Sequence, residues 1–287
     1  ERSAYFYDGK CRNLSAQEVN HLLQKNKHPV VRFKVQSGKT LFNDEIRGSL
    51  TFDHKEIDDF VIMRSDNIPT YHLAVVVDDH EMKISHIIRG DDHLTNTPKQ
   101  VLLYQALGWQ VPRFAHVPLI LGSDKKRLSM RHDATSVSEY RQAGYLPEAM
   151  FNFLALLGWS SDDNQEILTK QELIERFSLQ NISKNSAIFD KAKLMWMNSQ
   201  YISQMSDDDL YQRIKPLIQN SEIDSANFNE NYIKRSISLL KTRLKKLTDY
   251  LAYGQYFFKD PEQYDKKAVK KHWRGEDLSD RLSRTSD

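Results

Sequence analysis

Hydrophobic and polar positions change their spacing along the chain, and each change indicates a different kind of element. Apolar residues at helical spacing follow Ser15-Ala16-Gln17-Glu18, a capping box that predicts the start of a helix. From Val31 to Phe52, short runs of alternating hydrophobic and polar residues are typical of strands joined by turns. Residues 1–66 therefore predict a small α+β unit.

The pattern of the next segment is that of a parallel α/β sheet. Strands are expected at Ile84–Arg89 and at Val117–Leu121. Between them, Thr97 suits the cap of a helix, Pro98 its first residue and Gln100 a reciprocal partner of the cap. A strand, a helix and a second strand in this order form the unit of a parallel sheet.

After residue 134 the strand pattern disappears, and the chain predicts helices only. Pro147 is expected to begin one helix, with Gly158 just after its end. Thr169 and Ser206 are expected to cap two more helices. The polar residues 219–230 predict a loop.

The composition is that of a folded globular chain. With 39% hydrophobic and 28% charged residues in 287, it excludes collagen-like and low-complexity proteins. The longest apolar runs have about five residues, against roughly 20 for a bilayer span, so no membrane partner is expected. A single cysteine, Cys11, cannot form an internal disulfide, which is typical of a reducing compartment.

Charge is informative through its distribution. Forty-one basic residues nearly balance 39 acidic ones. Residues 231–274, however, hold twelve basic and four acidic residues. Such a cluster is typical of a surface that binds phosphates, and a solvated helix face is an equal alternative.

Two Asp-Asp-His triplets, Asp78-Asp79-His80 and Asp91-Asp92-His93, are candidates for chemistry. Grouped carboxylates and imidazoles suit a divalent cation, so a metal-dependent phosphohydrolase is one interpretation. Helix caps and loop residues after strands are the simpler one. Arg89 precedes the second triplet at the carboxyl end of a predicted strand, where open α/β sheets bind ligands. An Arg at this place suits a carboxylate, and a neighbouring Asp suits ribose hydroxyls.

A basic loop follows the last predicted strand. Five cationic or potentially cationic side chains lie between Lys125 and His132. A cluster of this kind can hold a polyphosphate whose negative charge grows in a transition state. A basic turn that is only solvated is the alternative.

At these residues the sequence resembles bacterial-type glutamyl-tRNA synthetase, a class I aminoacyl-tRNA synthetase. The resemblance extends from about Tyr7 to at least Lys271, and four segments carry it: Asp66–Val77, Ile87–Gln100, Arg127–Val137 and Gly144–Ser160. It implies ATP-dependent activation of L-glutamate to glutamyl-adenylate, followed by transfer to the tRNA for glutamate. ATP with Mg²⁺ would be a substrate.

The resemblance also implies an α/β plus all-α fold. The chain would hold the second half of a Rossmann-like, class I nucleotide-binding fold with a small α+β insert, followed by helical regions. Residues 1–66 would be the insert that binds the acceptor arm, and 67–133 the second half of the catalytic domain. Residues 134–205 would form the stem-contact domain, and 206–287 the start of the anticodon-binding domain.

The family's N-terminal half of the catalytic domain, with its His-x-Gly-His-like motif, has no counterpart in these 287 residues. The sequence is therefore expected to be a fragment or a truncated chain. Since that half supplies further ATP and glutamate ligands, we expect the chain alone to be an incomplete, inactive ligase.

Site residues follow from the resemblance, position by position. Tyr71, Val75 and Arg89 would contact glutamate, with Arg89 pairing with a carboxylate. Asp92 and His93 would contact ATP, with Asp92 beside the ribose.

The segment Arg127–Arg131 resembles the mobile "KMSKS" loop, whose cations hold the triphosphate. The resemblance assigns catalysis to Arg127, Ser129 and Arg131, and ATP binding to all five residues, Leu128 and Met130 included. Met130 departs from the family pattern, which has a lysine there. Because a thioether cannot neutralise a phosphate, we expect weakened adenylate formation unless Lys125, Lys126 or Arg131 compensates.

A partial zinc element is the last feature of the catalytic region. Tyr7 and Cys11 resemble the end of the family's zinc site. The two upstream cysteines of that site are absent from this sequence, so a tetrahedral site cannot be completed within it, and zinc is doubtful. A small buried thiol is the favoured interpretation of Cys11.

Partners follow from the same resemblance. Lys241, Arg243, Lys245 and Lys246 would contact tRNA. We expect a monomer in the cytoplasm, with an organellar origin left open. A non-catalytic module that binds tRNA with a steep salt dependence is a further alternative.

Overall fold

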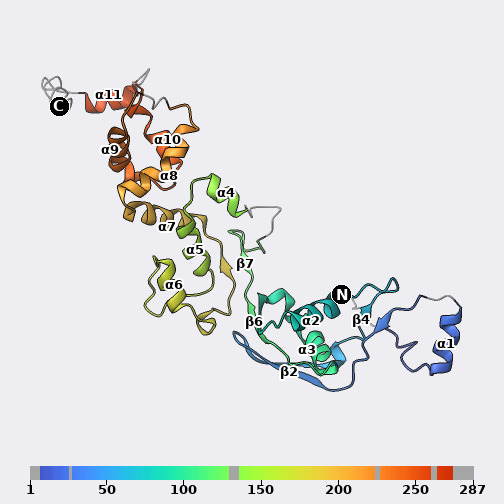
Figure 1. Ribbon diagram of the computed structural model, residues 1–287. Coiled ribbons are helices and arrows are strands. Elements are labelled where there is room, and N and C mark those ends of the chain that lie inside the picture. Colours follow the sequence, from blue (N-terminus) through green and yellow to red (C-terminus); the bar gives the residue numbers. More distant parts are fainter. Residues whose placement is uncertain (1–6, 26–27, 129–135, 224–226, 260–263, 274–287) are drawn as a thin grey trace. The chain divides into compact units, whose positions relative to one another are not determined.

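The computed structural model describes residues 7–25, 28–128, 136–223, 227–259 and 264–273 (Figure 1). The chain forms two compact units. The first contains residues 1–134 and 154–190, and the second contains residues 135–153 and 191–287. Each unit has its own hydrophobic core.

The first unit begins with the helix that the capping box predicts. Helix α1 (Ala16–Gln24) starts after Ser15, whose hydroxyl accepts from the Glu18 N–H, and the Glu18 carboxylate accepts from the Ser15 N–H at 2.7 Å. The box is confirmed because it depends only on residues three apart in sequence. Short strands follow as expected.

The strands of this region form antiparallel pairs. Strand β1 (Val31–Arg32) pairs antiparallel with β4 (Val61–Met63). Strands β2 (Lys39–Asp44) and β3 (Gly48–Asp53) form a hairpin, and the one-turn helix η1 (His54–Glu56) follows it. Along β2, buried and exposed residues alternate, so Thr40, Phe42 and Asp44 share the inner face.

A parallel strand pair forms the centre of this unit, as the strand–helix–strand pattern predicts. Strand β5 (His86–Gly90) pairs in parallel with β6 (Arg113–Val117), and the sheet order is β3-β2-β6-β5. The short helix η2 (Asp91–Asn96) and helix α3 (Thr97–Ala106) connect the two strands. Helix α2 (Tyr71–Glu81) packs against α3 (Figure 1).

Two expectations about strands need correction. The strand expected at Val117–Leu121 is divided between the end of β6 and a separate strand β7 (Ile120–Leu121), and Pro118, which has no N–H to donate, lies at the break. The chain after residue 134 is also not purely helical. Strand β8 (Ala187–Ile188) pairs in parallel with β7.

The remainder of the first unit surrounds a small apolar cluster. Trp159, Leu168 and Leu173 are its buried members. Leu173 belongs to α6 (Lys170–Arg176), whose predicted capping box from Thr169 to Glu172 is present. The short helix η3 (Leu179–Asn181) lies between α6 and β8.

The second unit is a helical bundle. It contains α4 (Val137–Gln142), the start of α5 (Pro147–Ala155) and, from residue 191 on, a further set of helices: α7 (Lys191–Gln204), α8 (Asp207–Gln219), α9 (Glu230–Leu240), η4 (Lys241–Arg243), α10 (Asp249–Tyr253), η5 (Gln255–Phe257) and α11 (Lys266–His272). The predicted cap Ser206 accepts from the Asp209 N–H at 3.1 Å. The loop expected at residues 219–230 separates α8 from α9.

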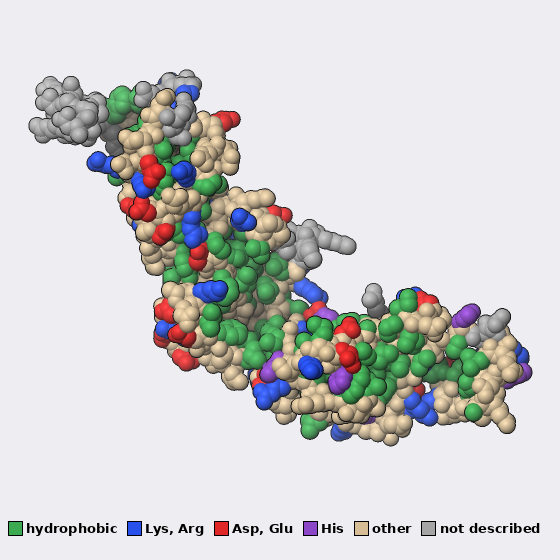
Figure 2. Space-filling model, viewed as in Figure 1, with side chains coloured by type: hydrophobic (Ala, Val, Ile, Leu, Met, Phe, Trp, Pro, Cys, Tyr) green, Lys and Arg blue, Asp and Glu red, His purple; other side chains and the backbone are tan. Residues whose placement is uncertain are grey.

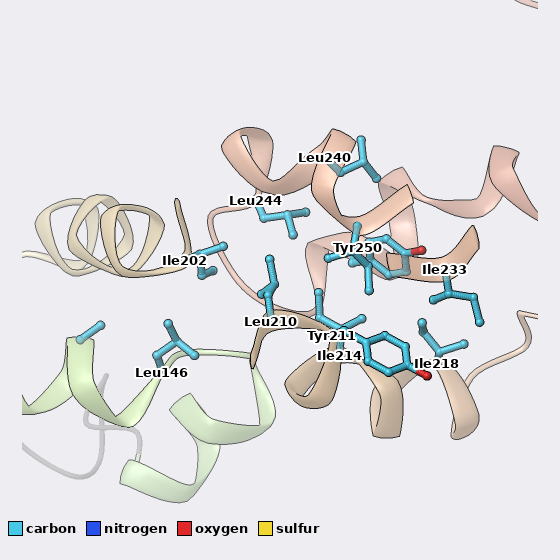
Figure 3. Close-up of a cluster of buried hydrophobic side chains, with 12 residues drawn as sticks. Leu146, Ile202, Leu210, Tyr211, Ile214, Ile218, Ile233, Leu240, Leu244 and Tyr250 are labelled. Carbon is cyan, nitrogen blue, oxygen red and sulfur yellow. The ribbon is translucent and has the colours of Figure 1, made fainter. Parts of the chain in front are cut away.

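The core of the second unit comes from inward-facing residues at helical spacing. Leu210, Ile214 and Ile218 of α8 face Ile233 and Leu240 of α9 (Figure 3), and Ile237 belongs to the same buried cluster. The Tyr250 and Ser236 hydroxyls lie 2.5 Å apart, so the phenol is satisfied although it is buried. No helix in the described part of the chain has the length and apolar character that a bilayer crossing requires.

Replacement of a core residue of α9 tests this packing. Ile237→Ala removes a side chain with 0% exposure, and we expect it to lower the free energy of unfolding of the second unit by about 2–5 kcal/mol. Leu239→Ala is the matched control, since Leu239 is 63% exposed on the same helix. Urea unfolding followed by circular dichroism measures both. Equal losses would contradict the packing.

Candidate active site

Arg89, at the carboxyl end of β5, is held by three side chains. Its Nε–H donates to Nε2 of His116 at 3.1 Å. Its Nη2 donates to the Thr97 hydroxyl at 2.8 Å and to Oε1 of Gln100 at 2.8 Å. Thr97 and Gln100 lie on one face of α3, three residues apart.

Thr97 and Gln100 therefore act differently from the helix cap that the sequence predicts. Thr97 is the first residue of α3, after the 3₁₀ helix η2, and the preceding residue, Asn96, makes no side-chain cap bond. The hydroxyl of Thr97 and the amide of Gln100 bind Arg89 instead. Bonds to the charged group of Arg89, eight and eleven residues earlier in the chain, replace the local cap.

Burial and neighbouring polar groups have opposite effects on the pKa of Arg89. Burial lowers the pKa of Arg89, and the Tyr71 hydroxyl and the Asp79 carboxylate act to raise it. The guanidinium also lies 5.5 Å from the centre of the Phe114 ring. The structure thus brings two of the predicted glutamate ligands, Tyr71 and Arg89, together.

The third predicted glutamate ligand, Val75, lies one helical turn after Tyr71 on α2. Its partly buried side chain packs against the apolar cluster around Val76 and Leu103. Tyr71, in contrast, is 49% exposed. Val75 therefore contributes to this apolar cluster.

A buried carboxylate–imidazole pair lies behind Arg89, and the sequence analysis did not identify it. Oδ2 of Asp44 lies 2.6 Å from Nδ1 of His116, and both side chains have 0% exposure. Desolvation raises the pKa of Asp44, but the N–H groups of Arg47 and Ile46 and the hydrogen bonds from His116 outweigh it, so the pKa is lowered. Burial lowers the pKa of His116 despite Asp44. The pair is thus a carboxylate and a neutral imidazole.

The predicted ATP residues meet beyond the end of β5. Nη2 of Arg127 lies 2.8 Å from Oδ2 of Asp92, and Asp91 is paired with Arg47 at 2.6 Å. Gly90 permits this approach, because a Cβ there would lie 2.6 Å from Oδ1 of Asp92.

The other predicted ATP residues are placed only in part. The His93 ring lies 6.2 Å from the Tyr71 ring. The N–H of Leu128 donates to the Ile120 carbonyl at 3.0 Å, which fixes the start of the basic loop. Ser129, Met130 and Arg131 lie outside the described residues.

The metal-site interpretation of the two Asp-Asp-His triplets gains no support. The first triplet does not follow a strand but lies on α2, where the His80 ring stacks on Trp109 at 3.9 Å. The acids of the second triplet pair with arginines. Among the residues that the structure describes, no three His, Cys, Asp or Glu side chains gather to hold a metal ion.

Cys11 and Tyr7 lie next to each other, but Cys11 is exposed, so the expectation of a buried thiol is wrong. The Cys11 N–H donates to the Tyr7 hydroxyl at 2.6 Å, which brings the two side chains to one surface. The tight turn that includes Gly9 makes this contact local.

The predicted tRNA-binding residues differ in their partners. Lys241 pairs with Asp207 at 3.0 Å, and Lys246 lies 3.9 Å from Asp249. Arg243 and Lys245 are exposed, and the described part of the chain offers neither an ion pair. Figure 2 shows acidic and basic side chains mixed over the helices of this unit.

A parallel strand pair in a mixed sheet carries an arginine and an aspartate at its carboxyl end, where open α/β sheets bind ligands, and the chain also contains a helical bundle. This combination agrees with a class I aminoacyl-tRNA synthetase. The family model for tRNA synthetases class I (E and Q), catalytic domain, matches residues 2–196. A model for an anticodon binding domain matches residues 209–286. The chain belongs to the class I tRNA synthetases of the glutamate and glutamine group.

The individual proteins that match the chain carry the name of a glutamate--tRNA ligase. The chain is 45% identical to glutamate--tRNA ligase 1 of Caldanaerobacter subterraneus over 100% of its own length and 60% of the relative's. It is 45% identical to the glutamate--tRNA ligase of Moorella thermoacetica, over 93% of this chain and 55% of the relative. A crystal structure of a glutamate tRNA ligase from Elizabethkingia meningosepticum in complex with its amino acid matches with a TM-score of 0.86 at 35% identity, over 98% of this chain and 60% of that one. The chain thus spans about 60% of the length of such relatives.

His72 predicts how stability depends on pH. It follows Tyr71 on α2, packs edge-on against Phe60 at 5.6 Å, and its pKa falls from 6.5 to about 4, chiefly through burial and also through the charges of Lys99 and Arg89. Because the folded pKa is depressed, its stabilising contribution is present above about pH 6.5 and is lost as the pH falls towards 4. With allowance for solvent screening, we expect a loss of about 1–2 kcal/mol.

Urea unfolding at pH 7.5 and pH 4.5 measures this loss. His72→Phe should reduce the difference between the two pH values, because it removes the titrating group and keeps a ring against Phe60. His21→Asn, at an exposed position on α1, is the control and should leave the difference unchanged. An unaltered difference in the His72 variant would disprove the assignment.

Proposed function

We propose that this chain forms the glutamate-binding and tRNA-contacting part of a glutamate--tRNA ligase, which activates L-glutamate with ATP and transfers it to the tRNA for glutamate. The arrangement around Arg89 is the main support. A guanidinium fixed at the end of a parallel strand, with the Tyr71 hydroxyl beside it, suits a carboxylate ligand. The names of the relatives agree with this choice of substrate.

ATP with Mg²⁺ would bind beside this position. Asp92 would accept from ribose hydroxyls and Arg127 would bind phosphates, so the ion pair between them would open when the nucleotide arrives. Ser129 and Arg131 would act with Arg127 on the triphosphate, as in the family's basic loop. Met130 would contribute no charge, which favours slow adenylate formation.

The tRNA would lie along both units. We assign the acceptor arm to residues 1–66, the stem to residues 134–205, and the anticodon region to residues 206–287, with residues 67–133 as the part of the catalytic domain that carries Arg89. Arg243 and Lys245 are the best placed of the basic residues, because acids already neutralise Lys241 and Lys246. A monomer in the cytoplasm would suit an enzyme of translation. For Tyr7 and Cys11, two side chains alone do not make a tetrahedral zinc site.

Glutamate-dependent ATP–pyrophosphate exchange tests the proposed function. The assay uses the chain alone and the chain fused to the part of the Elizabethkingia enzyme's catalytic domain that it does not cover. We expect exchange in the fusion and a loss of at least about 100-fold in Arg89→Ala, because a charge-assisted, paired contact to the substrate is removed. Arg64→Ala is the control, since Arg64 forms an exposed surface pair with Asp66.

The outcomes separate the alternatives. Exchange that Arg89→Ala leaves intact would place the carboxylate elsewhere. No exchange in the fusion, with tRNA binding retained, would instead favour a non-catalytic tRNA-binding module.

Binding of tRNA at different salt concentrations tests the assignment of the helical unit. We expect the double variant Arg243→Ala/Lys245→Ala to weaken binding for all tRNA sequences and to reduce the slope of log K against log salt by up to about 2. Lys83→Gln, at an exposed position in the part assigned to the catalytic domain, is the control. An unchanged slope in the double variant would show that these cations do not contact phosphates.

A further inference from the structure

The hydrogen bonds behind Arg89 form a continuous buried chain. Nδ1 of His116 faces Oδ2 of Asp44 at 2.6 Å, and Nε2 of the same ring faces both Nε of Arg89 at 3.1 Å and the Thr97 hydroxyl at 3.0 Å. Asp44, Thr97 and His116 have exposures of 1%, 0% and 0%. Neither Asp44 nor His116 has a part in the proposed chemistry.

We propose that Asp44 and His116 are positioning residues that fix the orientation of Arg89 and thereby set the affinity of the site for the carboxylate of an acidic amino acid. This inference rests on the proposed function, because it assigns the substrate contact to Arg89. Arg89 is positioned in three steps along this chain of hydrogen bonds.

The first step is the tautomer of His116. An arginine Nε–H can only donate, so Nε2 of His116 must accept, and the ring proton must then lie on Nδ1. Nδ1 faces Asp44, which as a carboxylate can only accept. Each group thus has one available role, and the order of donors and acceptors from Arg89 to Asp44 is fixed.

The second step is the fixation of Asp44. Its Oδ1 accepts from the N–H groups of Ile46 at 3.0 Å and Arg47 at 2.9 Å, and its Oδ2 accepts from the His116 N–H at 3.1 Å. A carboxylate with this many donors stays ionised and does not rotate. It therefore holds the ring of His116 in one orientation.

The third step concerns the guanidinium. Nε is bonded to His116, and Nη2 is bonded to Thr97 and Gln100. None of these three bonds uses Nη1, and the Tyr71 hydroxyl is a further hydrogen-bond partner of the guanidinium. Without His116, Nε would lack its acceptor, only Nη2 would be anchored, and the plane of the guanidinium would be free to turn about that anchor.

Asp44→Asn tests the hydrogen-bond chain at the end opposite Arg89, where no ligand contact is proposed. Because the N–H groups of Ile46 and Arg47 require an oxygen at the Oδ1 position, the amide NH2 of the variant would face Nδ1 and donate to it. The ring proton would then move to Nε2, which removes the acceptor for Arg89. We expect the KM for glutamate in the fused chain to rise roughly tenfold, as for the loss of a hydrogen bond to a charged group, while the KM for ATP changes less than twofold. Asp59→Asn is the matched control, because Asp59 is also a buried aspartate in the same unit but binds Arg12 and the Val35 N–H.

Two substitutions of His116 distinguish loss of the hydrogen-bond acceptor from a general loss of packing, through the KM for glutamate. His116→Gln places an amide oxygen close to the position of Nε2 and should keep the KM for glutamate within about threefold of the parent. His116→Met, similar in size but without a strong acceptor, should raise it roughly tenfold. Equal effects of the two variants, or of Asp44→Asn and Asp59→Asn, would overturn the proposal.

NMR of the unfused chain separates failure of this inference from failure of the proposed function. The ¹⁵N shifts of His116 should report a proton on Nδ1, and the Nε–H of Arg89 should exchange slowly. Both signs should be lost in Asp44→Asn and retained in Asp59→Asn. A proton on Nε2 of the parent would overturn the positioning role, whereas absence of exchange activity with the expected NMR signals would overturn only the choice of reaction.

Discussion

A buried carboxylate on β2 determines how the sheet and the candidate site are joined. Asp44 accepts from the backbone of its own hairpin turn and from the backbone and side chain of His116 on β6. Only one residue pair, Asp44 with Phe114, is in parallel register between these two strands. The side chain of Asp44 therefore supplements the single register pair between β2 and β6, and it links the β2–β3 hairpin to the strand pair that carries Arg89.

The cost of burying charge explains why this part of the molecule contains so many polar side chains. A partly buried guanidinium loses hydration, and a carboxylate with 0% side-chain exposure loses more. The neutral His116 lies between them and satisfies both without adding a third charge. Thr97 and Gln100 supply further acceptors to Arg89. Apolar residues of similar volume would stabilise this region at least as well as buried charges do. Stability alone therefore does not explain the network, whereas a requirement for one orientation of Arg89 does.

The sequence predicts those features that depend on neighbouring residues. The capping boxes at Ser15 and Thr169 are confirmed, as is the unit of strand, helix and strand around α3. It could not predict β8, whose partner β7 lies far along the chain, or the role of Thr97, where a local cap and a distant arginine compete for one hydroxyl. Asp44 and His116 are 72 residues apart. The available signal for Asp44 was a polar residue in an inward position of an alternating strand.

Pairing of charges also matters for the two adjacent acids after β5, which lie where the nucleotide is proposed to bind. Asp91 and Asp92 would repel each other, and each has its own arginine, Arg47 from the hairpin turn and Arg127 from the basic loop. The Arg47 pair is the more buried of the two, with 22% and 25% side-chain exposure, against 62% and 29% for Arg127 and Asp92. An exposed pair contributes about 0–1 kcal/mol, so a ligand with hydroxyls and phosphates can replace it at little cost. In the proposed function, the half-buried Arg47–Asp91 pair would hold the backbone of η2 in place while the ligand displaces the exposed pair.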